Sequence, residues 1–71
     1  METHVKIGRL IRTIRKELGL TQEELANELF ISPTHLRNIE KGKVNLSVNM
    51  ADKIMRYLVQ KRENQIGGTL E

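Results

Sequence analysis

Four polar side chains that can form hydrogen bonds fall within five consecutive positions of this sequence: Thr34, His35, Arg37 and Asn38. An arginine guanidinium can bond O6 and N7 of guanine at once, and an asparagine carboxamide can bond N6 and N7 of adenine. Threonine offers a methyl group to thymine, and we interpret His35 as a further, neutral polar contact. These residue types predict contacts with the base edges of double-stranded DNA, provided that one helix holds them on its outer face.

The charged residues are distributed unevenly, although the formal net charge is only +3. Basic residues concentrate in 6–16, 37–43 and 53–62, whereas four of the nine acidic residues fall between 17 and 28. An asymmetric field of this kind draws a polyanion to one face of a protein. The same charges would also suit an ordinary solvated surface, so charge alone does not separate these two interpretations.

Metal, cofactor and enzyme chemistry have little support in the sequence. The chain has no cysteine, and His4 and His35 lie far apart without a partner at ligand spacing, so we expect neither a metal nor a cofactor. Helix capping explains Glu23 and Glu24, and neither a nucleophile–base pair nor a phosphate-binding glycine loop is present, so we expect no enzyme. An apolar run of about 20 residues, which a membrane span requires, is also absent, and we expect a cytoplasmic protein.

Apolar residues recur at helical rather than strand spacing, and they predict the elements that must hold the polar cluster in place. The first helix is expected over residues 6–18, with Gly19 as its left-handed C-terminal cap. Thr21 and Glu24 have the spacing of a capping box, which predicts the start of a second helix of about eight residues.

The third predicted helix carries the four polar residues. Ser32 as N-cap and Pro33 at the first helical position predict its start, and Gly42 predicts its end. Ser47 then caps a fourth helix, whose apolar stripe is too wide for a helix with one buried side. We therefore predict an all-α fold, a compact bundle of four to five short helices around a central helix-turn-helix. Its domain is expected to span 1–66, before a flexible tail at 67–71 that we interpret in part as a remnant of cloning.

The segment TQEELANELFISPTHLRNIEKG resembles the Cro/CI-type (XRE-like) helix-turn-helix family of phage repressors and bacterial regulators. The preceding IGRLIRTIRKELGL and the following KVNLSVNMADKIMRYL extend the similarity from about Ile7 to Leu58. The pattern is fairly specific because T-Q-x-x-L-A, I-S and I-E-x-G occur together without a gap. The resemblance implies a lambda-repressor-like domain that binds a near-palindromic operator as a homodimer, with the 33–41 helix in the major groove. It also implies that the protein regulates transcription, as a repressor or controller.

The resemblance further implies roles for individual residues around the turn. It implies that Gln22 bonds a DNA phosphate at the positive end of its helix, and that Arg15 and Glu40 form a partly buried structural ion pair. The chain that follows the third helix is expected to run beside the sugar-phosphate backbone. Phosphate contacts are therefore expected from Lys41, Lys43 and Asn45. A further one is expected from the Ser32 hydroxyl at the start of the helix, and Arg9 or Arg12 is expected to reach flanking phosphates.

The sequence departs from the family pattern in two places. Phe30 stands where the family usually has glycine, and a left-handed phenylalanine would be strained by about 1 kcal/mol or more. We expect either a different turn geometry or burial of the ring to offset this strain. No helix breaker follows Leu58, so we expect the fourth helix to lengthen or a fifth helix to be short and irregular.

The wide apolar stripe of the fourth helix predicts a homodimer surface, with Met50, Tyr57, Leu58 and Val59 as interface candidates. An alternative function is that of an antitoxin or anti-repressor, a protein-interaction module that retains the helix-turn-helix fold. In that case the fourth helix and Ile66 would contact a toxin or another protein partner. Salt-sensitive DNA binding would favour the regulator, although an antitoxin can also bind DNA.

Overall fold

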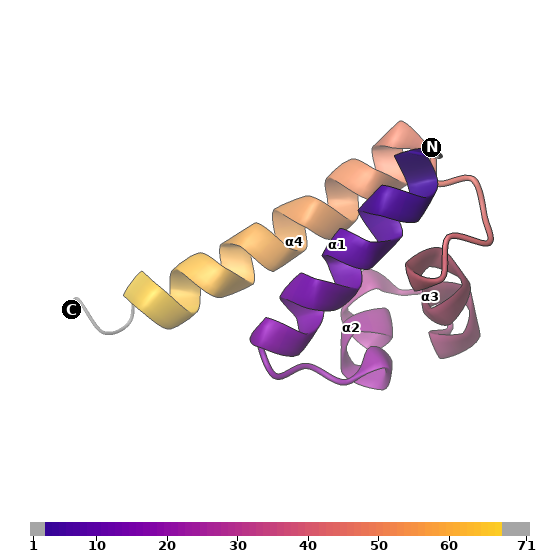
Figure 1. Cartoon of the computed structure of the whole chain (residues 1–71). Helices are drawn as coiled ribbons and strands as arrows, with labels where there is room; N and C mark the ends of the chain where they lie inside the picture. The colour runs from indigo at the N-terminus through magenta and orange to yellow at the C-terminus, as the bar shows by residue number, and fades with distance from the viewer. Residues whose placement is uncertain (1–2, 68–71) are drawn as a thin grey trace.

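Four α-helices follow one another in residues 3–67, the part of the chain that the computed structural model describes. They are α1 (Thr3–Glu17), α2 (Gln22–Leu29), α3 (Pro33–Glu40) and α4 (Val48–Gly67), arranged as Figure 1 shows. The predicted all-α class is confirmed. The predicted tail lies outside the described residues except for Gly67, which is instead the last residue of α4.

The starts of α2 and α3 are fixed by side chains that bond free backbone amides. The Thr21 hydroxyl accepts from the Glu24 amide at 3.0 Å, and the Glu24 carboxylate accepts from the Thr21 amide at 2.9 Å. The Ser32 hydroxyl accepts from the His35 amide at 3.0 Å, and Pro33 occupies the first helical position. These contacts satisfy donors that a helix cannot satisfy internally, and they confirm both predicted starts.

Helix α1 begins three residues earlier than the predicted Lys6. Its first turn is supported from outside the helix, because Val5 lies directly against Gly42 in the turn after α3. The end of α1 follows its prediction, since Gly19 has a φ of 76° in the left-handed region that glycine adopts most easily. Leu10, part of the apolar pattern of this helix, is 48% exposed and lies outside the core.

The core lies where α1, α2, α3 and the first half of α4 meet. Helix α1 packs against both α3 and α4, and α2 packs against α3. Its fully or almost fully buried members are Ile11, Leu25, Ala26, Leu29, Leu36, Ile39, Ile54 and Leu58. The C-terminal end of α4 extends past the other three helices, as Figure 1 shows. The small domain therefore fixes α3 from beneath and leaves its outer side open.

Gly8 allows α1 and α3 to approach backbone to backbone. A Cβ atom at this position would overlap the carbonyl oxygen of Ile39 and would press against that of Glu40. Any side chain here would push the C-terminal end of α3 away from α1. The sequence carried a signal for this contact, a lone glycine inside a helical pattern, which the prediction did not use.

Phe30 contradicts both expectations for the turn between α2 and α3. Its φ of 60° and ψ of 40° are left-handed, so the turn geometry is that of a glycine, and its side chain is 89% exposed, so burial does not offset the strain. The contact that the ring does make is with Lys53, whose Nζ lies 5.8 Å from the ring centroid. The same Nζ donates to the Leu29 carbonyl at 3.0 Å. Lys53 of α4 thus holds the strained end of α2.

We expect Phe30→Gly to stabilise the domain by about 1 kcal/mol, because relief of the left-handed strain exceeds the loss of an exposed cation–π contact. Phe30→Val should destabilise it, since a β-branched side chain tolerates this conformation least. Urea unfolding followed by circular dichroism measures both changes. A loss of stability in Phe30→Gly would mean that the ring contact outweighs the strain.

Helix α4 is capped as predicted, with the Ser47 hydroxyl accepting from the Met50 amide at 3.1 Å. It then continues through Val59 and Lys61 to Gly67 without a break, and within residues 3–67 no fifth helix follows it. Of the two outcomes expected after Leu58, the lengthened helix is the one observed. Good helix formers at most of these positions explain the continuity, because nothing in the sequence interrupts the backbone hydrogen bonds.

Candidate nucleic-acid interface

Helix α3 presents its polar side outward. Thr34, His35 and Arg37 are exposed and Asn38 is half-buried. Leu36 and Ile39 occupy the opposite side and are buried, so they fix the rotation of the helix about its axis. The four residues predicted to contact bases therefore share one face of the helix.

A buried ion pair anchors the C-terminal end of α3 to α1. Arg15 donates through Nε and a terminal nitrogen to the two carboxylate oxygens of Glu40, at 2.7 and 3.1 Å. Its other terminal nitrogen donates to the Leu20 carbonyl at 2.8 Å. Arg15 and Glu40 are 7% and 5% exposed, so both charges are withdrawn from water. The two residues are close enough in space to act as the structural pair that the resemblance implied.

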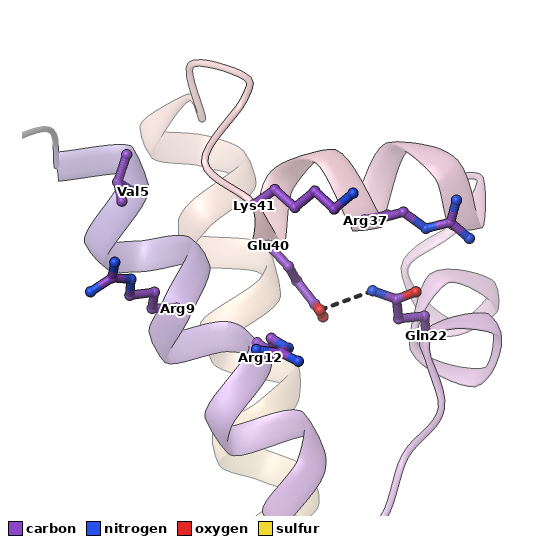
Figure 2. A pocket seen from close by; sticks show the side chains of 7 residues that line it. All are labelled: Val5, Arg9, Arg12, Gln22, Arg37, Glu40 and Lys41. Atoms are coloured by element: carbon purple, nitrogen blue, oxygen red, sulfur yellow. Dashed lines mark hydrogen bonds between the residues drawn. The ribbon is translucent and has the colours of Figure 1, made fainter.

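Gln22 joins this pair from the start of α2. Its Nε2 donates to Glu40 Oε1 at 3.1 Å, the bond drawn as a dashed line in Figure 2. A carboxamide nitrogen carries two hydrogens, so one remains available for a second acceptor. Glu40 thus receives bonds from α1 and α2 while it belongs to α3, and it ties the three helices together at one point.

A cavity of about 540 Å³ opens beside this junction, between α1, α2 and α3. Figure 2 shows the residues that line it: Val5, Arg9, Arg12, Gln22, Arg37, Glu40 and Lys41. Arg9 and Arg12 come from α1, one helical turn apart, whereas Arg37 and Lys41 come from α3 and its C-terminal cap. The fold therefore brings together five of the residues that sequence patterns had assigned separately to DNA contacts.

The cavity carries a strong positive charge. Its one carboxylate, that of Glu40, is already paired with Arg15. Among the described residues the two ion pairs are Arg15–Glu40 and Arg56–Asp52, so none involves the four cations that line the cavity. Guanidinium and ammonium groups without internal counterions are suited to phosphate oxygens.

The remaining residues predicted to contact phosphates surround α3 at its two ends. Ser32 lies before it, and its hydroxyl keeps a hydrogen to donate after accepting from His35. Lys43 and Asn45 lie in the exposed connector between α3 and α4. The Lys43 amide donates to the Asn38 carbonyl at 2.9 Å, so the connector leaves α3 along a fixed path.

Of the four residues predicted to form the dimer surface, one, Leu58, is wrong. Leu58 is fully buried among the core residues of its own chain, so it cannot contact a second copy. Met50 and Tyr57 are half-buried against the core, whereas Val59 is 48% exposed. Desolvation raises the pKa of Tyr57 above its ordinary value of 10.0, and the carboxylates of Glu28 and Glu24 raise it further. Tyr57 and Glu28 of α2 line the same small cavity.

No helix in residues 3–67 combines the length and the apolar character needed to cross a membrane. Within the same range, the acidic and histidine side chains form no group of three placed to hold a metal ion.

Comparison with known proteins identifies relatives over most of the chain. The model of a helix-turn-helix family matches residues 11–58. An uncharacterized HTH-type transcriptional regulator of Methanothermobacter thermautotrophicus is 47% identical over 49 residues, which cover 69% of this chain and 71% of that protein. A second, of Archaeoglobus fulgidus, is 44% identical over 46 residues, or 65% of this chain and 66% of that protein.

A third relative, regulator R559 of Acanthamoeba polyphaga mimivirus, is 38% identical over 53 residues, or 75% of this chain but 23% of that protein. No solved structure matches the chain. The family match covers the whole of α2 and α3, and with them the polar face and most of the residues that line the cavity.

Proposed function

Because this chain belongs to the XRE-like helix-turn-helix family of DNA-binding transcriptional regulators, we propose that it binds a near-palindromic operator as a homodimer and controls transcription there, as a repressor or controller. The observation that carries the proposal is the exposed polar face of α3 beside a cavity with four cations that form no ion pair with any residue of 3–67. One side of the molecule thus combines groups suited to base edges with groups suited to phosphates.

In this proposal α3 lies in the major groove. The groove of B-DNA is about 12 Å wide and admits one helix. Thr34, Arg37 and Asn38 read bases from the outer face, and His35 adds a polar contact near the start of the helix. Arg37 bonds a guanine and Asn38 an adenine, the pairs that their donors and acceptors match best.

The residues around α3 hold the DNA backbone. Gln22 directs the second hydrogen of its Nε2 to a phosphate at the start of α2, while Glu40 keeps the first. Arg9, Arg12 and Lys41 neutralise phosphates at the cavity, and Ser32, Lys43 and Asn45 bond the backbone on either side of α3. These contacts fix the position of α3 but do not depend on base sequence.

Two copies related by a two-fold axis would place their α3 helices in successive major grooves. The half-sites of the operator would then lie about 34–36 Å apart, one turn of the double helix. Each copy contributes the same contacts, so the operator is expected to read nearly the same on both strands.

Selection of bound fragments from random double-stranded DNA, followed by sequencing, tests the proposal. We expect enrichment of paired half-sites about 10–10.5 base pairs apart, and an affinity that falls steeply with salt concentration as counterions are released. A protein that enriches no sequence, and that heparin removes equally from every duplex, would contradict the proposal.

A further inference from the structure

The C-terminal half of α4 is only lightly covered by its own chain: Gln65 donates to the Leu18 carbonyl at 3.5 Å, and Lys61 lines a small cavity with Glu28 of α2. Within 48–65, the part of α4 whose burial the structure describes, Leu58 is the last buried residue, and beyond it Lys61 is half-buried while the others are exposed. Figure 1 shows this part of α4 projecting beyond the other helices. Helices of globular proteins gain most of their stability from packing of an apolar face. An apolar face in this part of α4 that its own chain leaves open is therefore a candidate surface for binding another molecule.

That face is a shallow groove of about 420 Å³ along α4, lined by Met55, Arg56, Val59, Gln60 and Glu63. Arg56, Val59 and Glu63 are separated by three and four residues, so they lie on one stripe of the helix. Val59 supplies an apolar centre, and a positive and a negative side chain flank it at opposite ends.

We propose that this groove binds the same groove of a second copy, with the two α4 helices antiparallel about an axis between Val59 and Gln60. The inference rests on the homodimer of the proposed function and assigns its surface. Arg56 and Glu63 are equally far from this axis, about 5 Å on either side at a rise of 1.5 Å per residue. Arg56 of one copy therefore lies level with Glu63 of the other, and the two ion pairs form together.

The charges favour a second copy in this orientation over other arrangements. A two-fold interface requires a surface that is complementary to itself, and a stripe with one charge of each sign around an apolar centre meets that requirement. A parallel arrangement would set Arg56 against Arg56 and Glu63 against Glu63, which repel each other. Asp52 already accepts from Arg56 Nε at 2.7 Å, which leaves the terminal guanidinium nitrogens for the carboxylate of the other copy.

The interface is a single helix stripe, so we expect it to be small and the dimer to dissociate readily in solution. Two adjacent half-sites on DNA would hold the copies close together and raise their effective concentration. The surface thus differs from the earlier interface candidates, since it retains Val59 and leaves out Met50, Tyr57 and Leu58.

Sedimentation of the full chain, with charge reversals of Arg56 and Glu63, tests this surface. We expect Arg56→Glu and Glu63→Arg each to weaken dimerisation at least about tenfold, since each places like charges opposite one another twice. The double variant Arg56→Glu/Glu63→Arg should restore dimerisation, because the pairs are then reversed rather than lost. Lys61→Glu, a reversal on the opposite side of α4, should leave dimerisation unchanged, and circular dichroism verifies that every variant is folded.

Measurements of dimerisation and of DNA binding together distinguish a failure of the α4 surface from a failure of the proposed function. Single reversals without effect, a double variant that fails to restore the dimer, or a wild-type chain that is monomeric at the concentrations of NMR spectroscopy would overturn the α4 surface. Sequence-selective DNA binding would leave the proposed function intact in all three cases. A restored dimer without any DNA binding would support the surface and contradict the proposed function.

Discussion

Glu40→Ala is expected to cost the domain about 3–5 kcal/mol of unfolding free energy, because it leaves the Arg15 guanidinium buried without a counterion. Arg15 is 7% exposed and donates two of its hydrogen bonds to Glu40, so loss of the carboxylate leaves a buried cation whose remaining hydrogen bond is to the Leu20 carbonyl. Native domains are stable by about 5–15 kcal/mol, and one of 71 residues belongs at the lower end of that range. The variant should therefore be partly unfolded at room temperature.

Urea unfolding followed by circular dichroism measures this loss, and three further variants identify its cause. Arg15→Met/Glu40→Leu removes both charges and should recover much of the stability, since an apolar pair of similar size often replaces a buried ion pair at little cost. Gln22→Ala should cost only about 1 kcal/mol, because Glu40 keeps Arg15. Asp52→Ala breaks the exposed pair with Arg56 and should change stability by about 0.5 kcal/mol or less.

A comparison of the stability lost in Glu40→Ala and in Asp52→Ala shows whether burial determines the cost of breaking an ion pair. The two ion pairs have the same shortest distance, 2.7 Å, but differ in burial. Equal effects of Glu40→Ala and Asp52→Ala would therefore mean that burial does not determine the cost. A double variant as unstable as Glu40→Ala would mean that the shape of the junction, and not its charge, holds α1 to α3.

The local parts of the fold could be predicted from sequence because the information lies within a few residues. Thr21 and Glu24 are three positions apart and form their capping box without help from the rest of the chain. Ser32 and Pro33 fix the start of α3 in the same way. The rotation of α3 also followed from its own pattern, since Leu36 and Ile39 are the apolar residues that could face the core.

The wrong predictions concern residues whose surroundings come from distant parts of the chain. The apolar pattern of α4 could not tell which side its own chain covers, so Leu58, which joins the core, was grouped with Val59, which does not. Phe30 is exposed and its ring lies near Lys53 of α4, and the early first turn of α1 lies against Gly42. Helical spacing carries no information about such contacts.

The candidate site was predictable residue by residue but not as an arrangement. Chemistry and spacing assigned the polar face of α3, and basic residues could be assigned to phosphates one at a time. The cavity requires that Arg9 and Arg12 of α1 meet Arg37 of α3, which depends on the close approach at Gly8. Arg37 lies both on the outer face of α3 and in the lining of the cavity. It is therefore placed to contact either a base or a phosphate.

Arg37→Ala and Arg12→Ala should therefore have different effects on DNA binding. If Arg37 bonds a guanine, its loss should weaken binding to the selected operator by about 1–3 kcal/mol, or roughly 5–150-fold, and weaken binding to random duplex much less. Arg12→Ala removes a phosphate contact and should weaken binding to both duplexes by the same factor. It should also lower the slope of log affinity against log salt by about 0.9.

Fluorescence anisotropy with operator and random duplexes, at several salt concentrations, distinguishes these effects. Arg62→Ala removes a charge from the exposed far part of α4 and is the control for a general loss of positive charge. If Arg37→Ala weakens binding to both duplexes equally and lowers the salt slope as Arg12→Ala does, then Arg37 belongs to the cavity and contacts phosphate. Base recognition would in that case depend on Asn38 and Thr34, and Asn38→Ala would be the variant that loses preference for the operator.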